Sequence, residues 1–155
     1  MSNSYDDVMA RRSDIMRQAL ALDYDSFQHG DLVFDYDALM SSTGYRLDDV
    51  ARIQAETKVG HTPLYELHRL TEAVREIAGP GKGARILLKD EAANASGSFK
   101  ARRASLSAHE AQVKGFAGMV TATSGNYGAA VASQAAQRGL ACIVIQEIYL
   151  SLIHI

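Results

Sequence analysis

Lys100 is the residue of this sequence best placed to act as a nucleophile. It follows a segment rich in turn-forming residues, which includes Asn94 and Ser96-Gly97-Ser98. The apolar run 86–88 leads into this turn, and an amphipathic helix is predicted to lead out of it. Backbone N–H groups at the start of a helix carry partial positive charge, which favours the neutral, nucleophilic form of an amine. Most lysines on a first turn are solvated surface groups, so a second signal is needed.

That second signal is the hexapeptide Thr123-Ser124-Gly125-Asn126-Tyr127-Gly128. It follows a predicted strand and opens a helix rich in alanine, which can approach a sheet closely. A glycine-flanked turn at a helix start offers backbone N–H groups to a carboxylate or phosphate. Asn126 adds an amide that can donate a hydrogen bond to a ring oxygen. An ordinary capped strand–helix turn is the alternative interpretation.

The elements that position both segments follow an alternating order of strands and helices. This order predicts an α/β fold with a parallel sheet and right-handed crossovers. Ligands of such sheets bind at the carboxyl ends of the strands, so both segments are expected to face one crevice. The predicted strands are 85–89 (buried), 118–122 and 141–146, and the predicted helices are 98–114 and 129–138.

The first third of the chain is predicted to be helical, with no strand. Helices are expected at 5–22, 36–41 and 47–56, followed by one at 64–78 with Thr62 as its N-cap and Pro63 at its first position. The loop 79–83 is not a P-loop, because its glycine spacing is wrong and no Ser or Thr follows Lys82.

The composition fits one soluble globular unit. The 155 residues are 47% hydrophobic and 22% charged, and a net charge of −2 gives no electrostatic reason to invoke nucleic acid or a membrane surface. No apolar run has the length of a signal peptide core or membrane span, so a cytoplasmic location is expected. Cys142 is predicted to be a buried, inert thiol. The scattered histidines lack metal-ligand spacing, so no metal is expected.

Three motifs together resemble the landmarks of fold-type II pyridoxal-phosphate enzymes, which include threonine synthase and the tryptophan synthase β subunit. They are GHTPL at 60–64, KDEAANASGSFKARR at 89–103 and SGNYG at 124–128. The resemblance implies an incomplete parallel sheet of the tryptophan synthase β type at 59–147. A helical N-terminal extension would occupy 1–58, and 148–155 is expected to be a non-native or truncated tail.

Within this group, the double arginine 102–103, the N-terminal extension and the run TSGNYGAAVASQAA are most similar to the β subunits of 2-amino-4-oxopentanoate thiolases. Such an enzyme cleaves its amino-acid substrate with coenzyme A to acetyl-CoA and alanine, in ornithine degradation. The resemblance therefore implies pyridoxal 5′-phosphate as cofactor, a thiolase α subunit as partner and an oligomeric full-length protein.

The resemblance also implies roles for individual residues. Lys100 would bind the cofactor covalently and then move protons at the substrate Cα. Asn126 would donate to the phenolic oxygen of the cofactor, and Ser98, with Asn94, would shape the turn that aims Lys100. The substrate carboxylate would bind to the loop Ser124, Gly125, Asn126, Tyr127 and Gly128.

The sequence departs from the family pattern at Ala95 (usually proline), Ala101 (often aspartate) and His61 (usually asparagine). His61 is expected to be solvated or to cap a turn. The chain also ends at Ile155, before the family's phosphate loop and pyridine partner, so little or no activity is expected from it. The alternatives are a threonine synthase-like lyase, an amino-acid dehydratase, and a non-catalytic α/β binding module, which Ala95 and Ala101 mildly favour.

Overall fold

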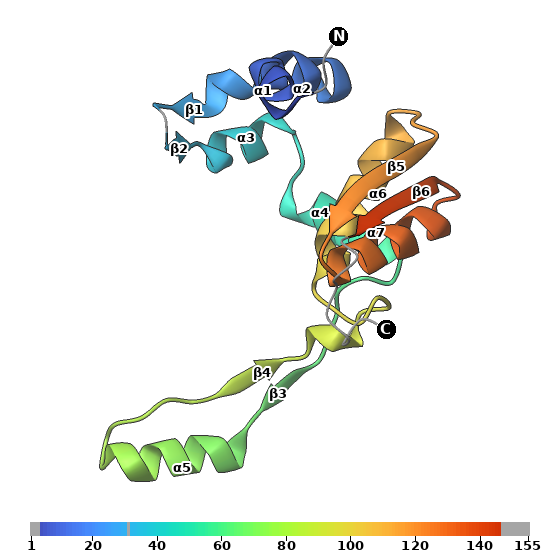
Figure 1. The fold of residues 1–155 in the computed structure, drawn as a ribbon. Helices are drawn as coiled ribbons and strands as arrows, with labels where there is room; N and C mark the ends of the chain where they lie inside the picture. Colours follow the sequence, from blue (N-terminus) through green and yellow to red (C-terminus); the bar gives the residue numbers. More distant parts are fainter. Residues whose placement is uncertain (1–3, 31, 147–155) are drawn as a thin grey trace. The chain divides into compact units, whose positions relative to one another are not determined.

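The computed structural model describes residues 4–30 and 32–146, and the predicted tail at 148–155 lies outside these ranges. The chain forms two compact units, divided between Arg46 and Leu47. In Figure 1 the first unit runs from blue to cyan and the second from cyan to red. No helix in the described ranges is long and apolar enough to cross a membrane.

The first unit is mostly helical. The region predicted as one helix at 5–22 contains two, α1 (Tyr5–Ala10) and α2 (Arg12–Leu20). Ser4 caps α1 by accepting a hydrogen bond from the Asp7 N–H, and α2 ends at Ala21, which adopts the left-handed conformation. The predicted helix at 36–41 is present as α3 (Tyr36–Ser42).

The prediction that the first third of the chain has no strand is wrong. After the 3₁₀ turn η1 (Tyr24–Phe27), two short strands, β1 (Gln28–His29) and β2 (Val33–Phe34), pair in antiparallel register. The rings of Tyr24 and Tyr36 lie 4.6 and 4.8 Å from the Phe34 ring, which anchors this hairpin. Strands of two residues are too short to leave an alternating pattern in the sequence.

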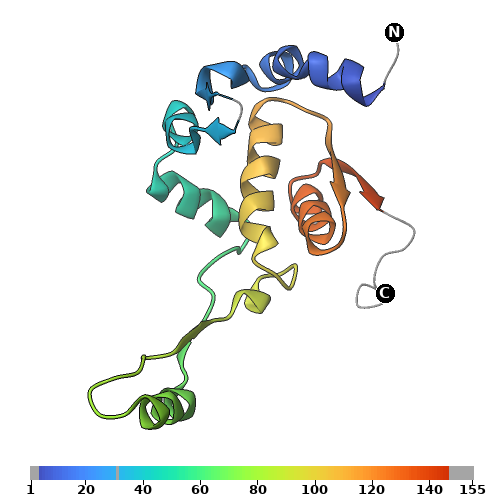
Figure 2. The same cartoon turned by 60° about the vertical axis from the view of Figure 1, so that its left-hand side comes forward.

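The second unit contains the predicted parallel strand–helix–strand arrangement. β5 (Gly118–Thr123) and β6 (Ala141–Gln146) pair in parallel, from Gly118 opposite Ala141 to Thr123 opposite Gln146. The connecting helix α7 (Asn126–Gln137) packs on both strands, and α6 (Lys100–Val113) packs against α7 (Figures 1 and 2). Helix α4 (Leu47–Glu56) has the bounds predicted for it and packs on α6.

Small side chains make up the interior of this unit. Ala104 on α6 and Ala130 and Val131 on α7 form its buried centre, and Met119 and Cys142 from the two strands pack against them. A thin interface of alanines lets the two helices approach closely. Cys142 is only partly buried, although its contact with this cluster agrees with a structural rather than a reactive role.

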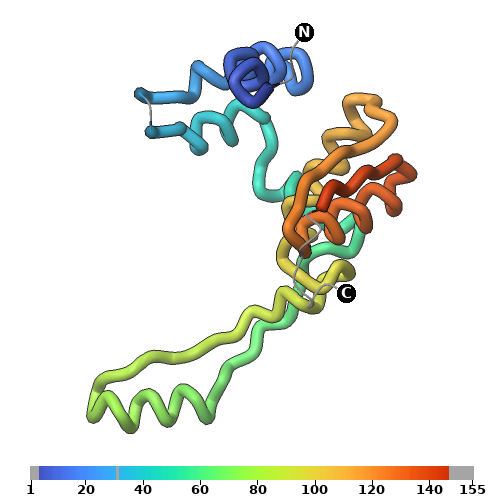
Figure 3. The backbone as a smooth tube through the Cα atoms, in the orientation of Figure 1, coloured from blue at the N-terminus to red at the C-terminus, as the bar shows by residue number. Residues whose placement is uncertain are grey.

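The segment 64–89 differs most from the prediction. Residues 64–66 form strand β3 (Leu64–Glu66) instead of the first turn of a helix, and α5 (His68–Ala78) begins only after Leu67. β4 (Leu87–Lys89) is shorter than predicted, is exposed and pairs antiparallel with β3. In Figure 3 the two strands run side by side, with α5 in the chain between them. Thr62 and Pro63 therefore do not cap a helix, and β4 does not join the parallel sheet.

Candidate functional site

Lys100 is the first residue of α6, so it lies on the first helical turn, as predicted, and a tight turn places it there. The Gly97 N–H donates to the Asn94 carbonyl at 2.7 Å, and Gly97 has a φ of 72°, a conformation that glycine adopts without strain. The Ala101 and Arg102 N–H groups donate to the carbonyls of Ser98 and Phe99, and these hydrogen bonds start the helix. The Lys100 ammonium lies 4.2 Å from the centre of the Phe99 ring.

A partly buried ion pair holds both sides of this turn. Arg102 donates from Nε and Nη2 to the two carboxylate oxygens of Glu91, at 2.7 and 2.8 Å. Thr62 donates to the same carboxylate at 2.7 Å and Asn94 at 3.0 Å, while the Asn94 side-chain oxygen accepts from the Gly60 N–H. The hydrogen bonds from Arg102 and then Thr62 lower the pKa of Glu91 to about 2. Glu91 thus ties the segment before β3, the turn and α6 together.

The second predicted segment is held by Thr123, the last residue of β5. Its hydroxyl oxygen accepts from the N–H groups of Gly125 and Gly128, at 3.0 and 3.1 Å, and its hydroxyl group donates to the Gly125 carbonyl. Among the described residues, the Asn126 and Tyr127 N–H groups have no protein acceptor. These two groups open a helix of 12 residues and suit an anion.

The two segments meet at one pocket of about 580 Å³. Lys100 and Asn126 therefore face the same space, which confirms that both loops share a crevice. Gly128, Asn94 and Ser98 do not line it. Ser98 is buried beneath the turn, and its hydroxyl has no hydrogen-bond partner among the described residues. The lining residues are Phe99, Lys100, Arg103, Ala122, Thr123, Ser124, Gly125, Asn126 and Tyr127.

The donor set of this pocket fits pyridoxal phosphate. Lys100 supplies an amine for the aldehyde, the Asn126 amide can donate to a ring oxygen, and unpaired N–H groups and the Arg103 guanidinium suit anionic groups. The sequence had pointed to Lys100 and Asn126 but not to Glu91, Thr123 or Arg103. Glu91 could have been found from the carboxylate and the guanidinium that stand on either side of the turn. Thr123 could have been found from its position two residues before Gly125.

Two of the departures from the family pattern take on a structural meaning. Ala101 is 1% exposed, so an aspartate there would need a buried partner. His61 has a φ of 50°, which is uncommon for a residue other than glycine, and its side chain is exposed. Within the described ranges no cluster of histidine, cysteine or acidic side chains could hold a metal.

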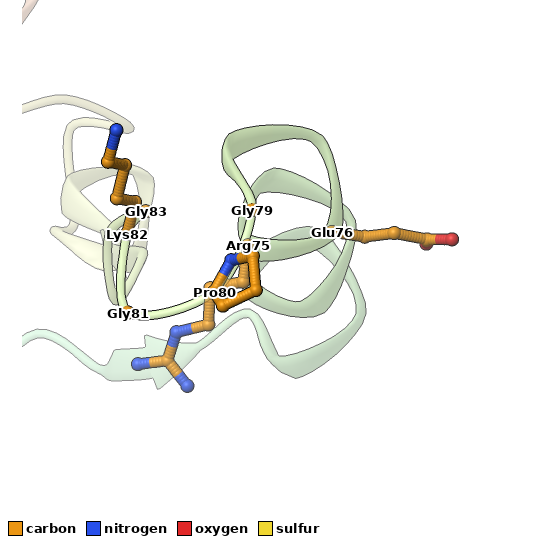
Figure 4. Close-up of a pocket in the computed structure, with 7 residues that line it drawn as sticks. All are labelled: Arg75, Glu76, Gly79, Pro80, Gly81, Lys82 and Gly83. Carbon is orange, nitrogen blue, oxygen red and sulfur yellow. The ribbon is translucent and has the colours of Figure 1, made fainter.

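A second hollow lies beside the loop 79–83, and its side chains do not converge. Figure 4 shows Arg75, Glu76 and Lys82 pointing in different directions around the glycines. Gly83 packs tightly on Arg75, since a Cβ atom at Gly83 would lie 2.8 Å from the Arg75 Cγ. This tight packing explains the glycine without any ligand.

Comparison with known proteins agrees with the chemistry of the pocket lined by Lys100 and Asn126. Residues 55–148 match the family described as pyridoxal-phosphate dependent enzyme. The chain is 55% identical over 146 residues to the 2-amino-4-ketopentanoate thiolase β subunit of Acetoanaerobium sticklandii, covering 94% of this chain and 31% of the relative. A second thiolase β subunit, from an unknown prokaryotic organism, is 56% identical over the same lengths.

A more distant relative is the threonine synthase of Halalkalibacterium halodurans, 35% identical over 86 residues, which are 56% of this chain and 22% of the relative. The chain spans 31% of the length of the two thiolase subunits. The family match covers more than half of the chain and includes every residue of the pocket. The chain therefore belongs to the family of pyridoxal-phosphate dependent enzymes.

Proposed function

We propose that the full-length protein containing this chain is the β subunit of a 2-amino-4-ketopentanoate thiolase. The observation that carries the proposal is that Lys100 and Asn126, each the first residue of its helix, line one pocket. The identity of 55% to a named thiolase β subunit supports the choice of substrate. The structural class is that of fold-type II enzymes, with residues 1–58 as an N-terminal extension and 59–147 as part of the cofactor-binding domain.

Lys100 holds the cofactor and, once released, moves a proton at the substrate Cα. Asn126 donates a hydrogen bond to the phenolic oxygen of the cofactor, while Ser98 and Asn94 keep the turn that aims Lys100. Ser124, Gly125, Tyr127 and Gly128 complete the loop that binds the substrate. Pyridoxal phosphate, when bound, supplies an electron sink for carbanionic charge on the amino acid.

The overall reaction breaks the C3–C4 bond of 2-amino-4-ketopentanoate. The sulfur of coenzyme A bonds to C4, which leaves as acetyl-CoA, and C3 takes up a proton to become the methyl group of alanine. The thiol of coenzyme A releases one proton and C3 takes one up, so the atoms and charges balance. We propose that the protein works in the cytoplasm with a separate α subunit and that its full-length form is an oligomer.

Absorbance tests the cofactor part of the proposal. The full-length protein should bind added pyridoxal phosphate, absorb near the violet edge of the visible range and lose that band on treatment with borohydride. Lys100→Ala should abolish the band. Lys82→Ala, which removes an amine from the exposed loop 79–83, should leave it unchanged. A colourless full-length protein that does not bind the cofactor would instead favour a non-catalytic binding module.

A second assay separates thiolase from lyase. With the α subunit present, the protein should release acetyl-CoA and alanine from 2-amino-4-ketopentanoate only when coenzyme A is added. The distant likeness to threonine synthase makes a lyase the second candidate. Deamination or phosphate elimination from a hydroxyamino acid, with no dependence on coenzyme A, would select that candidate and reject the thiolase.

A further inference from the structure

Two adjacent arginines on α6 have different environments. Arg102 is engaged by the carboxylate of Glu91, so its charge is already compensated inside the protein. Arg103 is exposed, lines the pocket of Lys100 and makes no ion pair with any carboxylate in the described part of the chain. The double arginine therefore combines a structural cation with an uncompensated one.

The position of Arg103 relative to Lys100 follows from helix geometry. Residues three apart on a helix lie on the same face, about one turn from each other. The Arg103 guanidinium carbon lies 4.8 Å from the centre of the Tyr127 ring, in the loop that opens α7. Stacking on an aromatic face restrains a guanidinium and leaves its N–H edges available, which is the arrangement that binds a carboxylate with two hydrogen bonds.

The charges around the pocket favour an anion. Its charged lining residues are Lys100 and Arg103, both cations, and none of the described lining residues is acidic. Ser124 and Asn126 add a hydroxyl and an amide from the facing loop. When the Lys100 amine is used to hold the cofactor, Arg103 stays charged, because a guanidinium does not lose its proton in proteins. Arg103 is then the permanent cation of the pocket.

We propose that Arg103 binds the α-carboxylate of the amino-acid substrate and thereby selects amino acids over simple amines. This inference rests on the proposed function and adds a residue to the predicted carboxylate loop. The α-carboxylate sits on the carbon that bears the amino group, so it stays within about one helical turn of the reacting atoms at Lys100. The phosphates of coenzyme A lie far along the molecule from its thiol, so they are the less suitable anion for this position.

The test compares binding of two ligands to the full-length protein with pyridoxal phosphate bound. One is 2-amino-4-ketopentanoate, and the other is 4-aminobutan-2-one, which is the same molecule without its carboxylate. Spectral titration should show that Arg103→Gln weakens binding of the amino acid by about 10- to 100-fold, as expected for loss of a charge-assisted pair. Binding of 4-aminobutan-2-one and the KM for coenzyme A should not change.

Two further variants control for charge and geometry. Arg69→Gln removes the same charge from an exposed position on α5, outside the pocket, and should leave all of these values unchanged. Arg103→Lys keeps the charge but loses the planar fork, so it should restore binding only in part. Calorimetric titration of both ligands into cofactor-free protein supplies a readout that does not depend on cofactor loading.

Several outcomes would overturn the inference. One is an equal loss of affinity for both ligands in Arg103→Gln, and another is a raised KM for coenzyme A with unchanged amino-acid binding. Absence of any preference for the carboxylate ligand in the wild-type protein, with or without cofactor, would also reject it. A missing absorption band with a preserved carboxylate preference would reject the proposed function while leaving Arg103 as a carboxylate site.

Discussion

Replacing Glu91 by glutamine tests how strongly the ion pair with Arg102 holds the turn before Lys100. The change keeps the size of the side chain but removes the charge that accepts both Arg102 hydrogen bonds at 2.7 and 2.8 Å. It also weakens the bonds from Thr62 and Asn94. The arginine would then be left without its carboxylate in a part-buried site, which is the costly way to break such a pair.

The magnitude follows from the pKa of Glu91, which lies at about 2 instead of the ordinary 4.5. Since one pKa unit is worth about 1.4 kcal/mol, this difference corresponds to an upper limit of roughly 3 to 4 kcal/mol of folding free energy. The side chains of Glu91 and Arg102 are 21% and 35% exposed, so water screens part of the interaction. We therefore expect Glu91→Gln to lower the free energy of unfolding by about 2 kcal/mol at pH 7.

The pH dependence of the unfolding free energy is the most specific test of this prediction. A depressed carboxyl pKa stabilises the folded state fully above the unfolded pKa near 4.5, and the contribution is lost as the pH falls towards 2. The stability gap between wild type and Glu91→Gln should therefore narrow between pH 5 and pH 3. Urea unfolding at several pH values measures it.

The matched control is Glu66→Gln, which removes a carboxylate that accepts from Arg85 at the same distance of 2.7 Å. That pair is more exposed and lies away from Lys100, so it should produce a smaller loss at pH 7. A gap for Glu91→Gln that stays constant with pH, or that does not exceed the loss in the control, would refute the reasoning.

Three further changes test the second loop and the interior. Thr123→Val should lower the free energy of unfolding by about 1–3 kcal/mol, because the Gly125 and Gly128 N–H groups lose their acceptor. Hydrogen exchange at these two amides should also become faster. Thr121→Val, on the same strand, should change neither quantity. Gly128→Ala places a Cβ 2.3 Å from the Thr123 Cγ2, so thermal unfolding should show a loss of at least about 2 kcal/mol. Glu56→Gln should lower the urea-unfolding free energy by about 1 kcal/mol, since it leaves the buried Arg138 without its carboxylate.

Sequence reasoning succeeded where the signal is local and strong. The helix at 47–56, the strands β5 and β6, and the alanine-rich α7 all follow from periodic patterns with glycine or turn residues between them. It failed at residues 64–66, whose apolar pattern continues smoothly into α5. Their strand form depends on pairing with 87–89, more than 20 residues later, which no local pattern records.

The same contrast applies to the site. Lys100 and Asn126 were predicted because their neighbours form recognisable turns, and the structure places both at one pocket. Glu91 and Thr62 were missed as members of the site, since the Glu91 carboxylate meets Thr62 across 29 residues of chain and Arg102 across 11. Arg103 was seen only as half of a double arginine, because the sequence does not say which of the two faces the pocket.

The close contact of Gly128 with Thr123 and Val144 has a consequence for how this protein can evolve. A Cβ atom at Gly128 would lie 2.8 Å from the Val144 Cγ1, on the strand that does not carry the loop. A larger residue at 144 would push the start of α7 away from the sheet and move Asn126 with it. The sequence of the loop 124–128 and the residue at position 144 are therefore under one shared constraint, and a change in one limits the changes that the other tolerates.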